Sequence, residues 1–166
     1  MTEQPLRVLF LSRRNTVRSL MAEAVMNQSG AGRFVARSAG VEVAKSDLLA
    51  LEVLEKARFA TKGLHPKTLQ DLLGVEKPPF DFIFTLSDTA RNEPFPECSG
   101  QPISAHWSCE DPMLVDEADI GKPVIYGRVL AGLERRISVF MQLPFETLDR
   151  ESLQHQVDQM SGGATS

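Results

Sequence analysis

The chain has 166 residues, 42% of them hydrophobic and 24% charged, and these values are typical of one soluble globular domain with a full core. Its net charge of −4 and pI near 5.4 argue against nucleic acid as a general partner, because such proteins usually present a broad basic surface. Two cysteines are too few for a disulfide scaffold, and no apolar run approaches the length of a membrane span.

The polar first residues do not resemble a signal peptide, so we expect a cytoplasmic protein with no membrane partner. We expect disorder over residues 1–5, one domain over 6–160 and a disordered tail over 161–166. The cysteines and histidines have no metal-ligand spacing, so we expect no metal and no other cofactor.

Strands and helices are expected to alternate along the first two thirds of the chain. Apolar runs predict strands over residues 7–11, 34–38, 80–86 and 103–107. Helical spacing and stop signals predict helices over 17–27, 46–57 and 66–73, the second of them capped by Ser46. The apolar face of this second helix is predicted to consist of Leu48, Leu49, Leu51, Val53 and Leu54.

The last third of the chain is predicted to be helical. Pro123 is well placed in the first turn of a helix that reaches about Gln142, and Asp149 can cap a final helix that reaches about Met160. The long helix is predicted to pack through Val129, Leu130, Leu133, Ile137, Phe140 and Met141. Together these patterns predict an α/β domain of three layers, a doubly wound parallel sheet with helices on both faces.

A polar loop joins the first strand to the first helix. Such a loop directs backbone N–H groups toward one point, with the positive end of the helix dipole behind them. Arg18 adds a planar guanidinium suited to a phosphate-like oxyanion. The predicted anion-binding residues are Ser12, Arg13, Arg14, Asn15, Thr16, Val17, Arg18 and Ser19.

Within this loop, several side chains have two open interpretations. Asn15 either holds the loop's shape by binding loop carbonyls or is an ordinary turn asparagine. Ser19 binds residue 12 or caps the helix. Arg13 and Arg14 either enlarge the positive field or are solvated surface residues.

Several ordered motifs carry a family resemblance. Asn15, Arg18-Ser19 and Met21-Ala22-Glu23-Ala24 resemble the signature of the low-molecular-weight protein-tyrosine phosphatase and thioredoxin-type arsenate reductase superfamily. The likeness continues in order over nearly the whole chain, through Ser38-Ala39-Gly40, Thr85-Leu86-Ser87-Asp88 and Glu110-Asp111-Pro112. It implies a four-stranded sheet of order 2-1-3-4 and Asp111 as the general acid, and it is nearer to the arsenate-reductase-like branch.

The departures from the family pattern concern cysteine. The resemblance implies a nucleophilic cysteine at position 12 and relay cysteines at positions 87 and 95, where this chain has Ser12, Ser87 and Phe95. An engineered trap would alter position 12 alone, so loss at three positions favours natural divergence. Cys98 and Cys109 fall elsewhere and are interpreted as free cysteines, with a pairing between them as the alternative.

Without a positioned base, a serine hydroxyl is a weak nucleophile. The sequence therefore predicts a degenerate family member that binds a phosphate- or arsenate-type oxyanion, or a phosphorylated ligand, with little or no turnover. Ser12 occupies the nucleophile position, Arg18 is the oxyanion ligand and Asp111 is the acid. A residual phosphatase or arsenate reductase stays open, as does a protein-interaction module with an unknown partner.

The segments that follow the strands are predicted to meet. Ser12, Ser87 and the 107–111 loop each come just after a strand, and the carboxyl ends of parallel strands share one edge of a sheet. His106 and Trp107 are expected to pack beside this edge. A Ser12–His106–Asp111 triad is conceivable from residue types alone.

Overall fold

The computed structural model describes residues 4–42, 44–75, 80–92, 102–109, 112 and 121–161. Its centre is a parallel four-stranded sheet of order β2-β1-β3-β4, which confirms the predicted topology. The strands are β1 (Leu6–Ser12), β2 (Phe34–Gly40), β3 (Phe82–Thr85) and β4 (Ile103–His106). In this register Ser12 lies opposite Gly40, so the carboxyl ends of the central strands reach the same edge.

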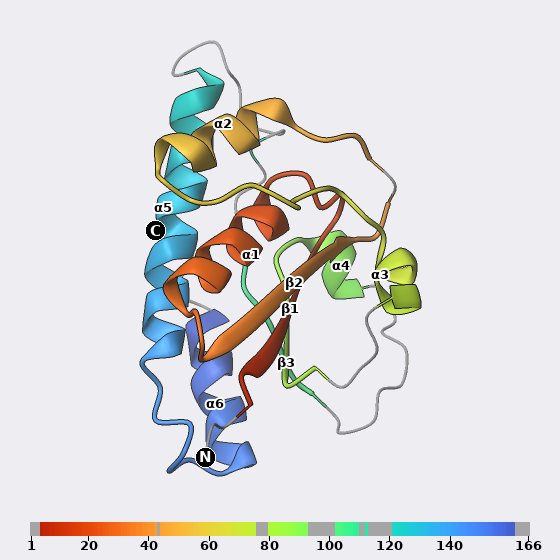
Figure 1. Cartoon of the computed structure of the whole chain (residues 1–166). Helices are drawn as coiled ribbons and strands as arrows, with labels where there is room; N and C mark the ends of the chain where they lie inside the picture. The colour runs from red at the N-terminus through yellow and green to blue at the C-terminus, as the bar shows by residue number, and fades with distance from the viewer. Residues whose placement is uncertain are drawn as a thin grey trace.

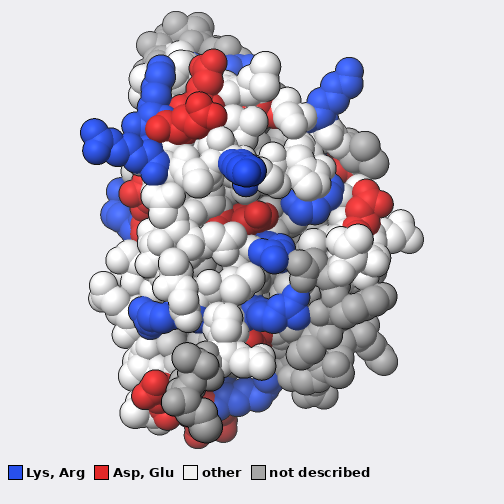
Figure 2. Space-filling model, in the orientation of Figure 1, with Lys and Arg blue, Asp and Glu red and all other residues white. Residues whose placement is uncertain are grey.

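Helices cover both faces of the sheet, as predicted (Figure 1). One face carries α1 (Arg18–Ser29), α2 (Leu48–Lys56), α5 (Lys122–Met141) and α6 (Arg150–Ser161). The other face carries the short helices α3 (Leu69–Val75) and α4 (Asp88–Asn92). On the face of the molecule in Figure 2, basic and acidic side chains are interspersed rather than gathered by sign.

The central strand β1 is buried on both sides, which explains its continuous apolar sequence. Val8 and Phe10 belong to the larger core under α1 and α5, whereas Leu9 and Leu11 belong to the smaller core under α3 and α4. The larger core is rich in aromatic rings, and the Phe84 and Trp107 rings stack with centroids 3.8 Å apart.

Helix α1 is buried from Arg18 to Met26 on all its sides, including its polar positions. A buried carboxylate requires a partner, and Glu23 accepts a hydrogen bond of 2.5 Å from the Ser38 hydroxyl. The helix ends at Ser29, two residues later than predicted, and Gly30 caps it by donating its N–H to the Met26 carbonyl at 2.8 Å. A side chain at Gly30 would collide with this carbonyl and with Phe34 and Met141.

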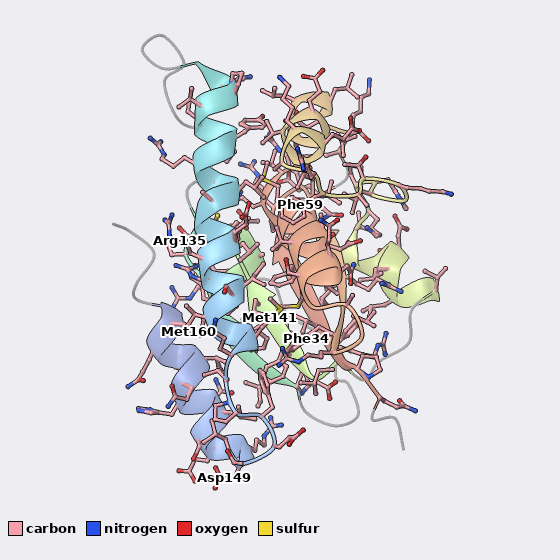
Figure 3. All side chains as sticks on the ribbon, turned by 60° about the vertical axis from the view of Figure 1, so that its left-hand side comes forward. Phe34, Phe59, Arg135, Met141, Asp149 and Met160 are labelled. Atoms are coloured by element: carbon pink, nitrogen blue, oxygen red, sulfur yellow. The ribbon has the colours of Figure 1, made fainter. Side chains whose placement is uncertain are left out.

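The two C-terminal helices agree with their predicted signals. Pro123 lies in the first turn of α5, and all six core residues predicted for this helix are buried, together with Ile125 and Tyr126, which were not predicted. Asp149 accepts a hydrogen bond of 2.8 Å from the Ser152 N–H and so caps α6. Figure 3 labels Asp149 at the start of this helix and Met160 near its end.

The local predictions for helices α2 and α4 differ from the structure in part. Helix α2 is capped by Asp47 rather than Ser46, because Asp47 Oδ1 accepts from the N–H groups two and three residues further on. Of its predicted apolar face, Leu54 is buried and Leu49 and Val53 pack against the larger core, whereas Leu48 is 72% exposed. Ala50, which was not predicted, is also buried. Helix α4 was not predicted, although the Ser87 hydroxyl accepts from the Ala90 N–H as a cap.

The predicted helix over 66–73 begins later, at Leu69. Its expected first residues pair instead with the end of β2, where the Gly40 N–H donates to the Lys67 carbonyl at 2.7 Å. The predictions for Phe95, Cys98, Asp111 and the tail over 162–166 lie outside the described residues. Within the described residues, the structure contains no helix that is both long and apolar enough to span a membrane.

Candidate functional site: the loop between the first strand and helix

The loop that follows β1 surrounds a pocket at the carboxyl edge of the sheet. The lining consists of Ser12, Arg13, Arg14, Asn15, Thr16, Val17, Arg18 and Pro112. This set contains seven of the eight residues predicted to bind an anion, and Ser19 lies behind them. Pro112, which follows the predicted acid Asp111 in sequence, brings the segment after β4 to the same pocket.

Arg18 joins three strand ends at this pocket. Its side chain is buried, and Nη1 donates to the carbonyls of Leu86 and Cys109, at 3.3 Å each. Leu86 follows β3 and Cys109 follows β4, so the predicted convergence of these segments is confirmed. These carbonyl contacts hold the buried guanidinium at the pocket.

A buried network of hydroxyl and amide groups supports the floor of the loop. Ser12 Oγ and Ser19 Oγ are 2.5 Å apart, and the Asn15 N–H donates to Ser12 Oγ at 3.2 Å. Asn15 Nδ2 also donates to Ser19 Oγ at 2.8 Å. Ser19 therefore binds residue 12 rather than capping α1, whose N-terminal cap has no side-chain hydrogen bond.

Asn15 determines the loop's backbone path. Its φ of 57° lies in the left-handed region, where asparagine is tolerated better than most residues. Of its two open interpretations, the side chain holds the loop's shape, but its partners are not the expected loop carbonyls. It accepts from the Lys67 N–H at 3.1 Å and donates to the Ser19 hydroxyl. Lys67 lies next to Asn15 because its carbonyl pairs with the Gly40 N–H at the end of β2.

Gly40 allows β2 to approach the back of the loop. A Cβ atom at this position would lie 2.8 Å from the Arg14 carbonyl carbon and 3.0 Å from the Asn15 nitrogen. Both of these atoms belong to the backbone, so they cannot rotate away. The Ser38-Ala39-Gly40 motif thus places a residue without a side chain where two backbone segments touch.

The pocket has the chemistry of an anion site. Among the described residues, the N–H groups of Arg14, Thr16 and Val17 donate to no protein acceptor. These groups precede the first turn of α1, where the helix dipole is positive. With the buried Arg18 guanidinium beside them, they can hold the oxygens of a tetrahedral anion.

Two further arginines lie at the margin of the pocket. Arg13 Nε is 3.2 Å from one carboxylate oxygen of Glu42, and Arg14 Nε is 3.8 Å from the other. Sequence reasoning did not identify Glu42, because nothing in its local pattern relates it to a loop 29 residues earlier. Arg13 and Arg14 line the pocket and are also partly solvated, and an enlarged positive field from them stays a prediction.

Among the described contacts, His106 binds β3 and α4 and shares no hydrogen bond with Ser12. Its Nδ1 lies 2.8 Å from Thr85 Oγ1, and its Nε2 lies 3.6 Å from Asp88. Burial of the ring, reinforced by the nearby Arg91, holds the pKa of His106 below its ordinary value, against the opposing effect of Asp88. The conceivable triad is therefore not formed in the described structure, and Trp107 is a buried core residue, as expected.

Arg136 of α5 supports the segment after β4 and was not identified from sequence. Its Nη1 donates to the Ser108 carbonyl at 3.1 Å, and its guanidinium lies 5.7 Å from the centre of the Trp107 ring. Burial lowers the pKa of Arg136, and the nearby Cys109 opposes this shift. Arg136 thereby holds the rim next to the residues that bind Arg18.

The parallel four-stranded sheet, with helices on both faces and the candidate site in the loop after β1, defines an α/β protein. The family described as low molecular weight phosphotyrosine protein phosphatase matches residues 7–156. The chain belongs to this family, which confirms the resemblance inferred from its motifs.

Arsenate reductases are among the similar proteins. The glutaredoxin arsenate reductase of Synechocystis sp. is 29% identical over 106 residues, which are 64% of this chain and 78% of that protein. The crystal structure of arsenate reductase from Archaeoglobus fulgidus is 31% identical, with a TM-score of 0.63, covering 82% of this chain and 99% of that one.

Two further structures share the fold. An arsenate reductase in the phosphate binding state has a TM-score of 0.67 at 24% identity, over 82% of this chain and 96% of that one. The low molecular weight protein tyrosine phosphatase from T. tengcongensis has a TM-score of 0.61 at 22% identity, over 83% and 99%.

Proposed function

We propose that this protein binds a phosphate- or arsenate-type oxyanion, or a phosphorylated group, in the loop over residues 12–19, with little or no turnover. The observation that carries the proposal is the contrast between Arg18 and Ser12. Arg18 is buried and fixed by two carbonyls, as an anion ligand should be. The Ser12 hydroxyl contacts only Ser19 and Asn15 among the described residues, and neither group is a general base.

The loop is suited to stabilising charge that is already present. The Ser19 hydroxyl and the Asn15 N–H can both donate to an anionic atom at position 12, and such contacts favour a thiolate. A serine hydroxyl holds its proton far more firmly than a thiol, so the same contacts leave it neutral. The proposal therefore assigns binding to the loop and assigns Ser12 a position in its floor.

Binding is tested by calorimetry with phosphate, arsenate and sulfate. Arg18→Lys retains the charge but not the planar guanidinium, and we expect it to weaken phosphate binding by about 10-fold or more, as for loss of a charged hydrogen bond. Arg135→Lys, an exposed position on α5 that Figure 3 labels, is the matched control. If Arg18→Lys binds phosphate as tightly as Arg135→Lys and the unaltered chain do, the proposal is wrong.

Turnover is tested with an aryl phosphate substrate and Ser12→Cys. The introduced thiolate would attack phosphorus, forming an S–P bond as the P–O bond to the aryl group breaks, with Asp111 proposed as the proton donor to the leaving oxygen. We expect at least about 100-fold faster turnover than in the unaltered chain. Robust turnover by the unaltered protein that Ser12→Ala abolishes would instead establish a serine nucleophile.

A residual phosphatase or arsenate reductase is the second candidate. Its support is the family match and the sequence similarity to arsenate reductases. Reductase chemistry requires thiols to carry a disulfide, and the family's relay positions here are Ser87 and Phe95. For this reason phosphatase turnover is the form of residual activity to measure first.

A further inference from the structure

The geometry points to Glu42 as a specificity residue that competes with ligand for Arg13 and Arg14. We propose that the site prefers a ligand with a second anionic group next to the oxyanion held by the loop, and that this group displaces Glu42. This inference rests on the proposed oxyanion binding and adds the class of ligand to it.

The first step of the argument is position. Both arginines line the same pocket as Arg18, but they differ from it in exposure. Arg18 is buried and held by carbonyl groups, whereas the side chains of Arg13 and Arg14 are each 42% exposed. When an oxyanion occupies the loop amides and Arg18, the guanidinium groups of Arg13 and Arg14 at the margin can therefore contact another part of the same ligand.

The second step is the placement of Glu42. Its own N–H donates to the Arg13 carbonyl at 2.9 Å, and the preceding Val41 N–H donates to the same carbonyl at 2.9 Å. These backbone bonds attach the residue to the loop itself. Its two carboxylate oxygens then face one arginine each, at 3.2 and 3.8 Å.

The third step is energetic. The Glu42 side chain is 45% exposed, and an ion pair between exposed side chains changes an equilibrium constant by at most about fivefold. Such a contact occupies the arginines without holding them firmly, so a ligand phosphoryl or carboxylate group can replace it at low cost. Bidentate binding of a phosphoryl group by a guanidinium is stronger than these pairs.

The test compares orthophosphate with pyrophosphate by calorimetry, at the same pH and ionic strength. The measured quantity is the ratio of the two dissociation constants. Glu42→Gln removes the competing charge and keeps the backbone bonds, and we expect it to increase the preference for pyrophosphate about three- to fivefold, the size of an exposed pair. The double variant Arg13→Gln/Arg14→Gln should lose most of that preference.

Glu151→Gln is the matched control. It makes the same change in net charge on α6, which packs near the beginning of β4 and therefore at the opposite end of the strands from the loop. We expect the ratio to stay within about 1.5-fold of the unaltered value, since exposed charges this far apart are screened by salt. Thermal melting of each variant establishes that it is folded.

The outcomes separate the two proposals. A ratio that is the same in the unaltered chain, Glu42→Gln and the double arginine variant overturns the role of Glu42. If Arg18→Lys still weakens both anions in that case, oxyanion binding itself stands. If the unaltered protein binds neither anion, both proposals fail together.

Discussion

Replacing Asn15 is the sharpest test of how the loop is held, because this side chain is fully buried and joins two parts of the chain. It donates to Ser19 Oγ at 2.8 Å and accepts from the Lys67 N–H at 3.1 Å. Asn15→Ala removes both hydrogen bonds and leaves the Lys67 N–H without its acceptor.

The expected cost is the sum of three effects. Two lost hydrogen bonds cost about 0.5–1.5 kcal/mol each, and a buried donor left without a partner adds to that. Alanine at a φ of 57° adds a further penalty of about 1–2 kcal/mol, because its Cβ crowds the backbone in the left-handed region. We expect Asn15→Ala to lower the free energy of unfolding by about 3 kcal/mol.

Asn15→Gly separates the two causes. Glycine accepts the left-handed conformation at little steric cost but makes neither hydrogen bond, so we expect it to recover about 1 kcal/mol relative to alanine. Both variants should bind phosphate more weakly, because the N–H groups of the loop lose their fixed direction.

The measurement is urea unfolding followed by circular dichroism, with calorimetric titration of phosphate on the same samples. Asn92→Ala, at an exposed position in α4, is the control and should change the free energy of unfolding by less than about 0.5 kcal/mol. The reasoning is refuted if Asn15→Ala costs less than about 1 kcal/mol and binds phosphate as well as the unaltered chain.

Two further predictions concern the back and the edge of the site. Gly40→Ala should destabilise the fold by about 1–3 kcal/mol and weaken phosphate binding, because its Cβ would lie 2.8 Å from the Arg14 carbonyl carbon. Gly132→Ala in α5 is the control, since a Cβ there would meet no neighbouring element within 4 Å. It should stabilise the fold by about 0.5–1 kcal/mol in the same urea assay. Burial lowers the pKa of His106 in the folded chain. As the pH falls through about 6.5, the ring therefore binds a proton in the unfolded chain before it does so in the folded chain, and the free energy of unfolding declines. The urea midpoints at pH 7.5 and 5.5 should differ less in His106→Gln than in the unaltered chain. A difference of the same size in both proteins would exclude this ring as the source of the pH dependence.

Local signals predicted the parts of the fold that depend on local physics. The apolar run of β1, the helical spacing along α5 and the cap at Asp149 were all predicted from a few neighbouring residues. In the loop, the motif placed Arg18 at the candidate site, and the structure decides between the two open interpretations of Ser19 in favour of its contact with Ser12. These features are set by interactions within about ten residues or by a family motif.

The errors arise where distant segments decide between similar local options. Ser46 and Asp47 are adjacent caps of comparable propensity, and Asp47 also accepts a hydrogen bond of 2.6 Å from the Tyr126 hydroxyl of α5. Lys67 was expected in a helix because nothing nearby indicates its pairing with β2 and Asn15. Glu42 and Arg136 were missed for the same reason, since each acts on a loop far away in sequence.

In the proposed function, anion binding and turnover would depend on different atoms of this site, and this separation is why loss of turnover need not abolish binding. The hydrogen bonds to Arg18 and Asn15 from outside the loop involve Leu86, Cys109 and Lys67, and among the described contacts none of these three residues binds Ser12 Oγ. A hydroxyl at position 12 also fits the floor, where it lies 2.5 Å from the Ser19 hydroxyl. A neutral hydroxyl in place of a thiolate would therefore keep the pocket's shape and remove one negative charge, whereas loss of Arg18 would remove the cationic group and loss of Asn15 would remove the support of the loop.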